Sequence, residues 1–295
     1  MLFRSSVMSI TVRPLHPLIG AEIGGVDMRH PMDPGTFGAV HDAWMKHLVI
    51  VFPKQPVTDE EHVAFTRHFG EPEIFHQSII RSRRMREIFR VSNVNDDNEL
   101  MPPSHPTVQQ VSLAQLWHTD SSYLVSPCIG SLLHGVEISR TGGETQFINM
   151  YAVYEDLPDA LKRQVEKRRA LHEFENLHRL RDLKPMTEAE RAAVPGVWQP
   201  LVRVHPVTGR KSLYISPIYN TAIEGMATDE AERLIADLTE FAAQPRFMYR
   251  HRWEPDDVLM WDNRCTVHAV TPHDPTERRV MHRTTIVGAE PVFAA

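Results

Sequence analysis

The stretch "DVLMWDNRCTVHAV", residues 257–270, combines strand-forming residues, a turn and a candidate metal ligand. Its apolar start is short and rich in strand-forming residues, which predicts a strand. The tetrapeptide "WDNR" that follows has the Asp and Asn typical of a turn. His268 comes just beyond this turn. The pattern therefore predicts a strand and a turn that deliver an imidazole to one end of the sheet.

Similar short runs, bounded by Pro and Gly, recur along the chain and predict a mainly β fold with flanking helices. Strands at this spacing are typical of an antiparallel barrel or sandwich. The runs are "LVIVFP", "GSLLHGVEI", "TQFINM", "PLVRVHP", "RKSLYIS" and "RRVMHRTTIVG".

Four stretches have the composition and spacing of helices. Residues 58–70 begin with Thr58 and have Glu61 three positions later, the arrangement of a capping box, and they end at Gly70. Residues 187–196 begin with the same Thr-x-x-Glu pattern. Charged stretches with helical apolar spacing predict two further helices, at 157–174 and 228–245.

Length and composition favour one soluble domain over residues 1–295, with residues 1–9 as a disordered leader. A net charge of -6 argues against nucleic acid or an anionic membrane as partner. No apolar run approaches the roughly 20 residues of a membrane span, and the start lacks the features of a secretory signal. With only two cysteines, far apart, we expect a reducing, cytoplasmic location.

A second candidate ligand pair lies in "LWHTDSSY", residues 116–123. In an extended strand, residues two apart point to the same face with Cα atoms about 6.6 Å apart, so His118 and Asp120 could converge on one ion. Taken alone, the pair is as well explained by a buried ion pair. Together with His268, however, two histidines and one carboxylate make a facial triad, which leaves open positions on Fe(II).

The stretch 278–288, "RRVMHRTTIVG", adds two arginines. In a strand, the period of two places Arg279 and Arg283 on one face with Met281 and Thr285. An unpaired guanidinium in a largely apolar strand is costly to bury, so both arginines require anionic partners. The rigid fork of arginine suits a carboxylate.

In this order and spacing, "LWHTD", "TGGETQF", "WDNRCTVHAV" and "RRVMHRTTI" resemble the Fe(II)/2-oxoglutarate-dependent dioxygenases of the taurine dioxygenase family. The resemblance extends from residue 16 to residue 288. That family includes enzymes that attack phenoxyalkanoic acids and alkyl sulfates. The resemblance implies a double-stranded β-helix, or jelly roll, with iron held by His118, Asp120 and His268.

The resemblance also implies the reaction. O2 and 2-oxoglutarate would be consumed, succinate and CO2 released, and a small anionic organic substrate hydroxylated. Where the hydroxylated carbon bears sulfur or oxygen, a C–S or C–O bond would then break. Relatives form dimers or tetramers, so we expect a homo-oligomer.

Binding residues follow from the same resemblance. Arg279 and Thr145 would hold the C5 carboxylate of 2-oxoglutarate, whereas Arg283 would lie near its C1 carboxylate and the anion of the substrate. The candidates for substrate contact are His76, Ser121, Tyr123, Tyr219 and Arg283.

One position departs from the taurine-cleaving type. Ala114 stands where those enzymes have an asparagine, four residues before the first iron histidine. This difference disfavours taurine itself. A sulfonate, a sulfate ester, an aryloxyalkanoate and a natural acid remain open as substrates.

Two alternatives from other classes use the same residues. One is a non-catalytic jelly-roll protein that binds an anion through its arginines. The other is a zinc hydrolase with the same His, Asp and His ligands, which would leave Thr145, Arg279 and Arg283 without a role.

Overall fold

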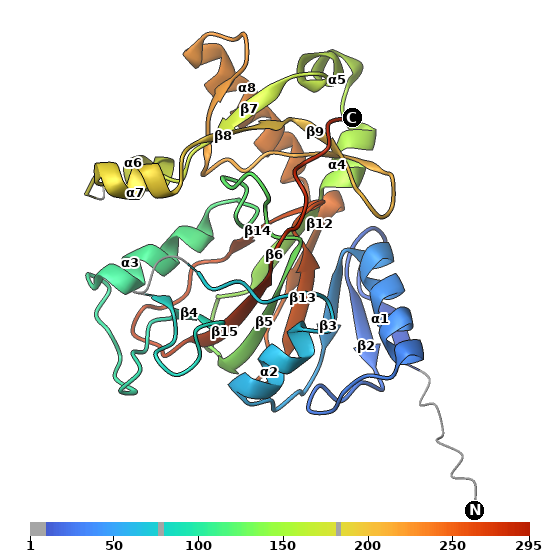
Figure 1. Cartoon of the computed structure of the whole chain (residues 1–295), viewed down its shortest axis with the longest axis vertical. Coiled ribbons are helices and arrows are strands. Elements are labelled where there is room, and N and C mark those ends of the chain that lie inside the picture. Colours follow the sequence, from blue (N-terminus) through green and yellow to red (C-terminus); the bar gives the residue numbers. More distant parts are fainter. Residues whose placement is uncertain (1–9, 76–79, 181–183) are drawn as a thin grey trace, which may run out of the picture.

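The computed structural model describes residues 10–75, 80–180 and 184–295, and its largest sheet has seven strands (Figure 1). All neighbouring strands pair antiparallel except β2 and β3, which are parallel. In spatial order the strands are β1 (Thr11–Pro14), β2 (Ala21–Gly24), β3 (Val49–Phe52), β13 (Val258–Asp262), β5 (Gly130–Glu137), β15 (Val280–Ile286) and β4 (Phe89–Ser92).

A smaller antiparallel sheet packs against this one to form the jelly roll. Its strands are β12 (Met248–His251), β6 (Thr145–Asn149) and β14 (Thr266–Val270). The space between the two sheets is filled by apolar side chains from both, and the rings of Phe147 and Trp261 lie 5.5 Å apart there. The sequence 257–270 is the hairpin that joins the two sheets, since β13 belongs to the large sheet and β14 to the small one. This confirms the predicted strand and the presence of a turn, but the turn lies at residues 263–265, because Trp261 and Asp262 still belong to β13.

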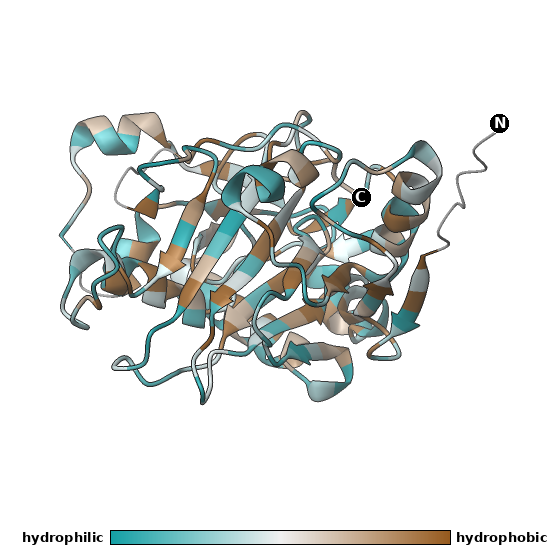
Figure 2. Cartoon of the chain, turned by 90° about the horizontal axis from the view of Figure 1, so that it is seen from below, coloured by the Kyte–Doolittle hydropathy of each residue, from teal (hydrophilic) through white to brown (hydrophobic). Residues whose placement is uncertain are grey.

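Successive side chains of β3, β5 and β13 point to opposite faces of the large sheet, and both faces are covered. Leu133 and Leu259 pack toward the small sheet, whereas their neighbours Leu132 and Met260 pack against helices. Figure 2 shows brown, apolar segments in several strands of the molecule. A strand with both faces buried has a nearly continuous apolar sequence, as in "VLMW".

Helices α1 (Pro34–His47) and α2 (Asp59–Thr66) contribute to the outer cover of the large sheet. Asp33 caps α1, and Pro34 occupies its first turn, where no amide hydrogen is needed. The predicted capping box of Thr58 and Glu61 is present at the start of α2. The predicted end at Gly70 is wrong: the regular helix ends at Thr66, and the chain continues as turns.

Two small sheets lie beyond the open end of the jelly roll, in the upper part of Figure 1. One contains β11 (Asn220–Ile223), β7 (Arg169–His172) and β8 (Val197–Pro200), and the other pairs β10 (Lys211–Leu213) with β9 (Val202–Val204). The remaining helices are α3 (Pro106–Ser112), α4 (Met150–Asp156), α5 (Asp159–Val165), α6 (Asn176–Leu180), α7 (Glu188–Ala193), α8 (Thr228–Ala242) and the 3-10 turns η2 (Leu113–Gln115) and η3 (Pro245–Phe247). None of the helices in the described residues is both long enough and apolar enough to cross a membrane.

The predicted helix over 157–174 is wrong in its second half. Helix α5 ends at Val165, and Lys167 takes a left-handed φ of 60°, which interrupts the helix. The chain then enters β7, whose residues pair with both β8 and β11. Tertiary pairing therefore overrides a local helical composition. The helices predicted at 187–196 and 228–245 are confirmed as α7 and α8.

Two details of the predicted site segments also need correction. The stretch 116–123 is not a strand: it is a loop whose only ladder contact is a bridge between His118 and His268. Arg279 lies just before β15 rather than inside it, and the register shifts between Val280 and Met281. The strict period of two therefore does not extend back to Arg279.

Candidate metal centre and active site

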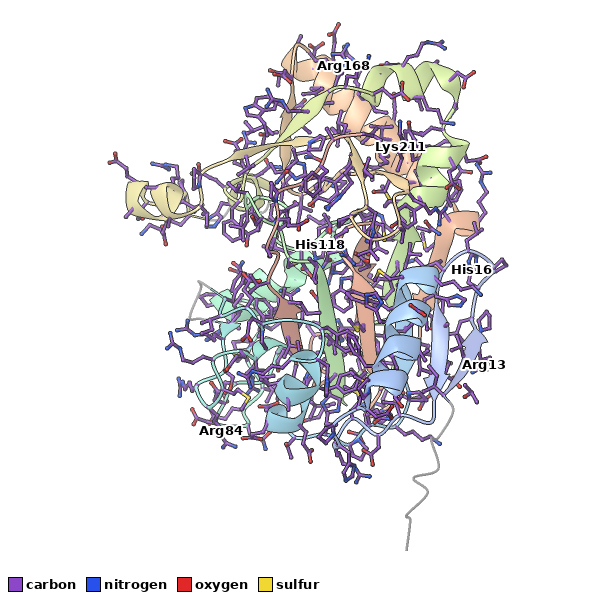
Figure 3. The ribbon with its side chains drawn as sticks, turned by 45° about the vertical axis from the view of Figure 1, so that its right-hand side comes forward. Arg13, His16, Arg84, His118, Arg168 and Lys211 are labelled. Atoms are coloured by element: carbon purple, nitrogen blue, oxygen red, sulfur yellow. The ribbon has the colours of Figure 1, made fainter. Side chains whose placement is uncertain are left out.

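Three predicted ligands meet where the 116–123 loop crosses strand β14. The backbones of His118 and His268 exchange two hydrogen bonds, of 3.0 and 2.7 Å, which brings their rings to a centroid distance of 4.1 Å. The Nε2 atoms of both histidines lie 3.9 Å from an oxygen of Asp120. The label of His118 in Figure 3 marks this point near the middle of the molecule. All three side chains are buried, and the separation of their donor atoms suits one metal ion.

The protonation of the three groups fits a metal site. Burial lowers the pKa of both histidines, so the rings are neutral. The Nδ1 of His118 lies 2.7 Å from the carbonyl oxygen of Leu116; Nδ1 therefore carries the hydrogen, and the lone pair is on Nε2, which faces Asp120. Burial acts to raise the pKa of Asp120, but the charge of Arg283, with the hydrogen bond from Ser131, outweighs it and keeps the carboxylate ionised. Neutral imidazoles and an ionised carboxylate are the forms that bind metal.

Asp120 is held by residues from three strands of the large sheet or their ends. Arg283 on β15 donates to Oδ1 at 2.8 Å, and the hydroxyl of Ser131 on β5 donates to Oδ2 at the same distance. The amide of Asn263, which follows β13, lies 3.5 Å from Oδ2. Sequence reasoning missed Ser131 and Asn263. Asn263 belongs to "WDNR", where an Asn is also explained by the turn.

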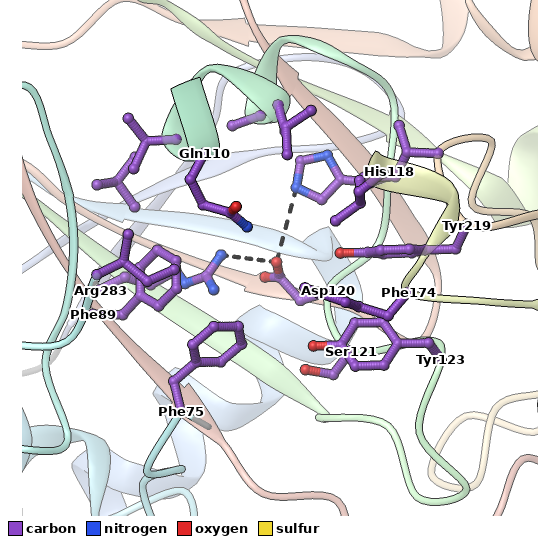
Figure 4. Close-up of a pocket in the computed structure, with 17 residues that line it drawn as sticks. Phe75, Phe89, Gln110, His118, Asp120, Ser121, Tyr123, Phe174, Tyr219 and Arg283 are labelled. Carbon is purple, nitrogen blue, oxygen red and sulfur yellow. Dashed lines mark hydrogen bonds and ion pairs between the residues drawn. The ribbon is translucent and has the colours of Figure 1, made fainter. Parts of the chain in front are cut away.

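A cavity with largely aromatic walls opens beside the carboxylate (Figure 4). It contains about 580 Å³ of space free of protein atoms, including the open solvent at its mouth. Tyr123 and Tyr219 form one wall with Phe174, and Tyr123 lies 4.8–4.9 Å from each of the other two ring centroids. Phe75 and Phe89 form the other, with ring centroids 4.9 Å apart in an edge-to-face contact.

Of the predicted substrate-contact residues, Ser121, Tyr123, Tyr219 and Arg283 all line this cavity. His76 lies outside the described residues. Phe75, Phe89, Gln110 and Phe174 also line the cavity but were not predicted. Nothing in the sequence distinguishes these side chains from core aromatics or from an exposed helix glutamine, because they come from four separate segments of the chain.

The guanidinium of Arg283 is fixed between an anion and a ring. It stacks on Phe89, with Cζ 4.2 Å from the ring centroid, while Nη1 bonds to Asp120. Burial acts to lower the pKa of Arg283, but the charge of Asp120 outweighs it and raises the pKa. Among the described residues, the buried Nε of Arg283 has no hydrogen-bond partner, and the Arg283 side chain lines the cavity.

Arg279 lies in an adjoining cavity, separate from the aromatic one. The two cavities share Val91, Val111 and Ala114 in their walls. Arg279 is 4% exposed, and its side chain bonds to the carbonyl oxygen of Gly143 at 3.2 Å. No carboxylate in the described part of the chain pairs with it, and burial lowers its pKa to about 10. A buried guanidinium without a counter-charge is costly and favours an anionic ligand here.

Thr145 lies two residues after Gly143, at the start of β6. Its hydroxyl oxygen accepts a hydrogen bond of 3.0 Å from the indole of Trp253, so its own hydrogen can be donated elsewhere. Thr145 pairs in register with Val270, which lines the Arg279 cavity. Val270 and His268 are two residues apart on β14, and therefore share a face. The metal centre and the Arg279 cavity thus lie along one strand.

Known proteins are similar to this chain along most of its length. A family profile described as taurine catabolism dioxygenase TauD, TfdA family, matches residues 11–285. Two relatives are alpha-ketoglutarate-dependent 2,4-dichlorophenoxyacetate dioxygenases. One, from Burkholderia sp. (strain RASC), is 34% identical over 95% of both chains. The other, from Cupriavidus pinatubonensis, is 36% identical over 94% of this chain and 98% of its own.

A solved structure gives the same result. The crystal structure of AAD-2 in complex with Mn(II) and N-oxalylglycine superimposes with a TM-score of 0.89 at 35% identity, covering 98% of this chain and 100% of that one.

Proposed function

The chain belongs to the TauD/TfdA family and is a non-haem iron dioxygenase that uses 2-oxoglutarate as co-substrate; from this premise we propose that its substrate is an aryloxyalkanoate. The aromatic cavity beside Asp120 is the observation that carries the proposal. The fold, predicted as a jelly roll, and the predicted cofactors agree with the relatives.

The residues that would hold iron are His118, Asp120 and His268. The distance from each imidazole Nε2 to Asp120 is 3.9 Å, which is too long for a hydrogen bond and leaves room for an ion between them. Two imidazoles and one carboxylate are the donor set of a site that keeps positions open for substrates on Fe(II).

We assign the far carboxylate of 2-oxoglutarate to Arg279 and Thr145. Arg279 supplies a buried positive charge with no carboxylate partner in the described residues, and the hydroxyl of Thr145 supplies a donor. Because the two cavities adjoin, a chelating diacid can reach from the metal centre to Arg279.

The aryl ring of the substrate would lie between the aromatic walls. Tyr123 and Tyr219 offer ring faces and edges on one side, and Phe75 and Phe89 do so on the other. Offset or edge-to-face contacts between such rings are favourable beyond their buried area. The substrate carboxylate would bind the guanidinium of Arg283, and Ser121 lines the same cavity.

Bound iron, together with 2-oxoglutarate and O2, supplies the oxidant that replaces a C–H bond of the substrate by C–OH, with release of succinate and CO2. The protein orients the target carbon and excludes water. In an aryloxyacetate, Arg283 would place the carbon between the carboxylate and the ether oxygen next to the metal centre. Hydroxylation there gives a hemiacetal, and its collapse breaks the C–O bond to yield a phenol and glyoxylate.

The experiment compares phenoxyacetate, 2,4-dichlorophenoxyacetate, hexyl sulfate and taurine with Fe(II), 2-oxoglutarate and ascorbate. We expect succinate and phenol in equal amounts from the aryloxyacetates. Hexyl sulfate and taurine should give only the slow succinate release of uncoupled turnover. Coupled turnover of hexyl sulfate or taurine, with uncoupled turnover of both aryloxyacetates, would rule the proposal out.

Neither alternative class is favoured. The family match extends over residues 11–285, and the relatives with similarity along most of the chain are dioxygenases.

A further inference from the structure

Asn263 is the residue that connects the two halves of the metal centre. It lies in the turn between β13 and β14, the hairpin that carries His268, and is 2% exposed. Its backbone carbonyl oxygen accepts a 2.8 Å hydrogen bond from the hydroxyl of Thr119, the residue between the two ligands of the 116–123 loop. The backbone of this one hairpin residue thus contacts the loop that carries the other two ligands.

The orientation of the Asn263 amide is set by Trp261. The indole nitrogen of Trp261 can only donate a hydrogen bond, and it lies 2.9 Å from Oδ1 of Asn263. The backbone N–H of Asp120 also points to Oδ1, at 3.3 Å. With two donors on the oxygen, the NH2 group must face the other way, toward Ser131 at 3.1 Å and Oδ2 of Asp120 at 3.5 Å.

The loop that carries Asp120 is held by side-chain hydrogen bonds, including those of Ser216 to Thr119 and of His172 and Gln199 to Ser122, rather than by a strand ladder. It forms no regular strand, and its ladder contact is the one bridge between His118 and His268. Ser121, directly after Asp120, has a left-handed φ of 54°, a conformation that non-glycine residues rarely adopt unless neighbours enforce it. The contacts of Asn263 and Ser131 supply such enforcement at the adjacent carboxylate.

We propose that Asn263, acting with Ser131, is a positioning residue that holds Oδ2 of Asp120 and thereby sets the affinity of the metal centre. This inference rests on the proposed role of Asp120 as a ligand. The two oxygens of Asp120 have different partners: Oδ2 accepts from Ser131 at 2.8 Å, whereas Oδ1 accepts from Arg283 at 2.8 Å. Loss of the Asn263 amide would remove its 3.5 Å contact with Oδ2 and the 3.1 Å hydrogen bond that orients the hydroxyl of Ser131, and would thereby loosen the hold on Oδ2.

The test is Mn(II) affinity, measured on the isolated protein by the loss of the free-ion EPR signal, without 2-oxoglutarate or substrate. Asn263→Leu keeps the branched shape of the side chain and removes its polar atoms. We expect a 10- to 100-fold weaker affinity, the effect typical of residues that orient metal ligands. Asn149→Leu is the matched control, because it removes an equally buried amide, 3% exposed, that caps α4 instead. It should lose thermal stability but keep wild-type affinity.

Ser131→Ala is the second variant, and it keeps the test decisive if Asn263→Leu does not fold. It removes one hydroxyl near the start of β5, and we expect an affinity several-fold to about 10-fold weaker. In the double variant the two losses should combine less than additively, because both act on Oδ2. Wild-type affinity in folded Ser131→Ala and Asn263→Leu, or equal losses in Asn263→Leu and Asn149→Leu, would overturn the inference.

Asp120→Ala separates this inference from the proposed function. If Asp120→Ala abolishes Mn(II) binding while the Asn263 and Ser131 variants bind normally, the positioning role fails and the metal centre stands. If Asp120→Ala binds Mn(II) as the wild type does, the metal centre itself is wrong, and the inference falls with it.

Discussion

Among the described residues, two buried clusters of histidine and carboxylate groups differ in whether their polar atoms hydrogen-bond to one another. The first is the metal-centre cluster, His118, Asp120 and His268. The second, the Asp262 cluster, consists of His205, Asp262, Arg264 and Cys265. In both, three donor atoms of the kinds that bind metals lie within 4.8 Å of one another. By proximity alone, the two clusters are equivalent.

In the Asp262 cluster, the atoms of His205 and Asp262 that could bind a metal already form hydrogen bonds and ion pairs within the cluster. His205 Nε2 lies 3.0 Å from Oδ2 of Asp262, and Arg264 makes a bidentate pair with both oxygens at 2.8 and 2.7 Å. Burial raises the pKa of the Cys265 thiol, and a protonated thiol is a poor ligand.

In the metal-centre cluster, by contrast, both imidazoles stand 3.9 Å from the carboxylate. A metal site is indicated by potential ligand atoms that converge without bonding to one another. A high density of histidine and carboxylate groups does not indicate one by itself.

The largest expected effect breaks the first cluster. Asp120→Ala removes the charged ligand, so succinate formation and Mn(II) binding should both fall below detection while the far-ultraviolet circular dichroism stays that of the wild type. Succinate assays and EPR measure the two losses. Turnover at the wild-type rate would mean that the cluster is a structural ion pair like the second.

Asp262→Ala breaks the second cluster and should change stability instead of chemistry. It leaves the buried guanidinium of Arg264 without its partner, which is expected to lower the free energy of unfolding by about 3–5 kcal/mol. Urea denaturation measures the loss, and Mn(II) affinity of the folded protein should not change. Asp229→Ala, which breaks an exposed pair with Arg233 on α8, should alter stability by no more than about 0.5 kcal/mol. Loss of Mn(II) binding in Asp262→Ala would contradict the distinction between the clusters.

Arg279→Ala sharpens the comparison, because Arg279 is a buried arginine with no carboxylate partner in the described residues, unlike Arg264. Loss of a buried charge-assisted pair with 2-oxoglutarate costs roughly 2–5 kcal/mol. The KM for 2-oxoglutarate should therefore rise by roughly 30-fold or more, with a smaller change in kcat. Arg278→Ala is the control, because Arg278 is the neighbouring residue and its side chain pairs with Glu137 at the surface. If Arg279→Ala had the wild-type KM for 2-oxoglutarate, the assignment of Arg279 to the far carboxylate would be wrong.

The last prediction concerns the pH dependence of stability and a buried histidine outside both clusters. His62 on α2 bonds to Thr284 and not to a carboxylate, and burial, with the nearby charges of His134 and His282, lowers its pKa to about 3. The unfolded chain, with a histidine pKa near 6.5, binds this proton more readily. Stability should therefore fall as the pH drops from about 6.5 toward 3, with His62 contributing up to about 1.4 kcal/mol per pH unit.

Urea denaturation across this range measures the slope. His62→Leu should be less stable at neutral pH but should show a shallower decline in acid. His30→Gln, which alters a histidine whose side chain is 72% exposed, should leave the slope as in the wild type. An unchanged slope in His62→Leu would show that other groups carry the acid sensitivity.

The sequence anticipated the elements whose signals are local. Capping boxes at Thr58 and Thr187 begin α2 and α7, and the apolar run before "WDNR" is β13. The error over 157–174 has a specific cause: seven residues of that stretch do form α5, but β7 is selected by the two strands that flank it. Neither strand is visible from the local pattern.

By itself, the sequence determined that the chain would form many short strands and where two of its helices would begin. It also contained three candidate ligands and two arginines in an order that resembles a dioxygenase family. These are properties of residue type and spacing. Only the tertiary structure decided that the 116–123 loop is not a strand, that Ser131 and Asn263 hold Asp120, and that five aromatic rings surround one cavity. Such contacts join separate segments of the chain, in the case of Asn263 and Asp120 residues that are 143 positions apart. Their geometry depends on how whole sheets pack, which no local pattern encodes.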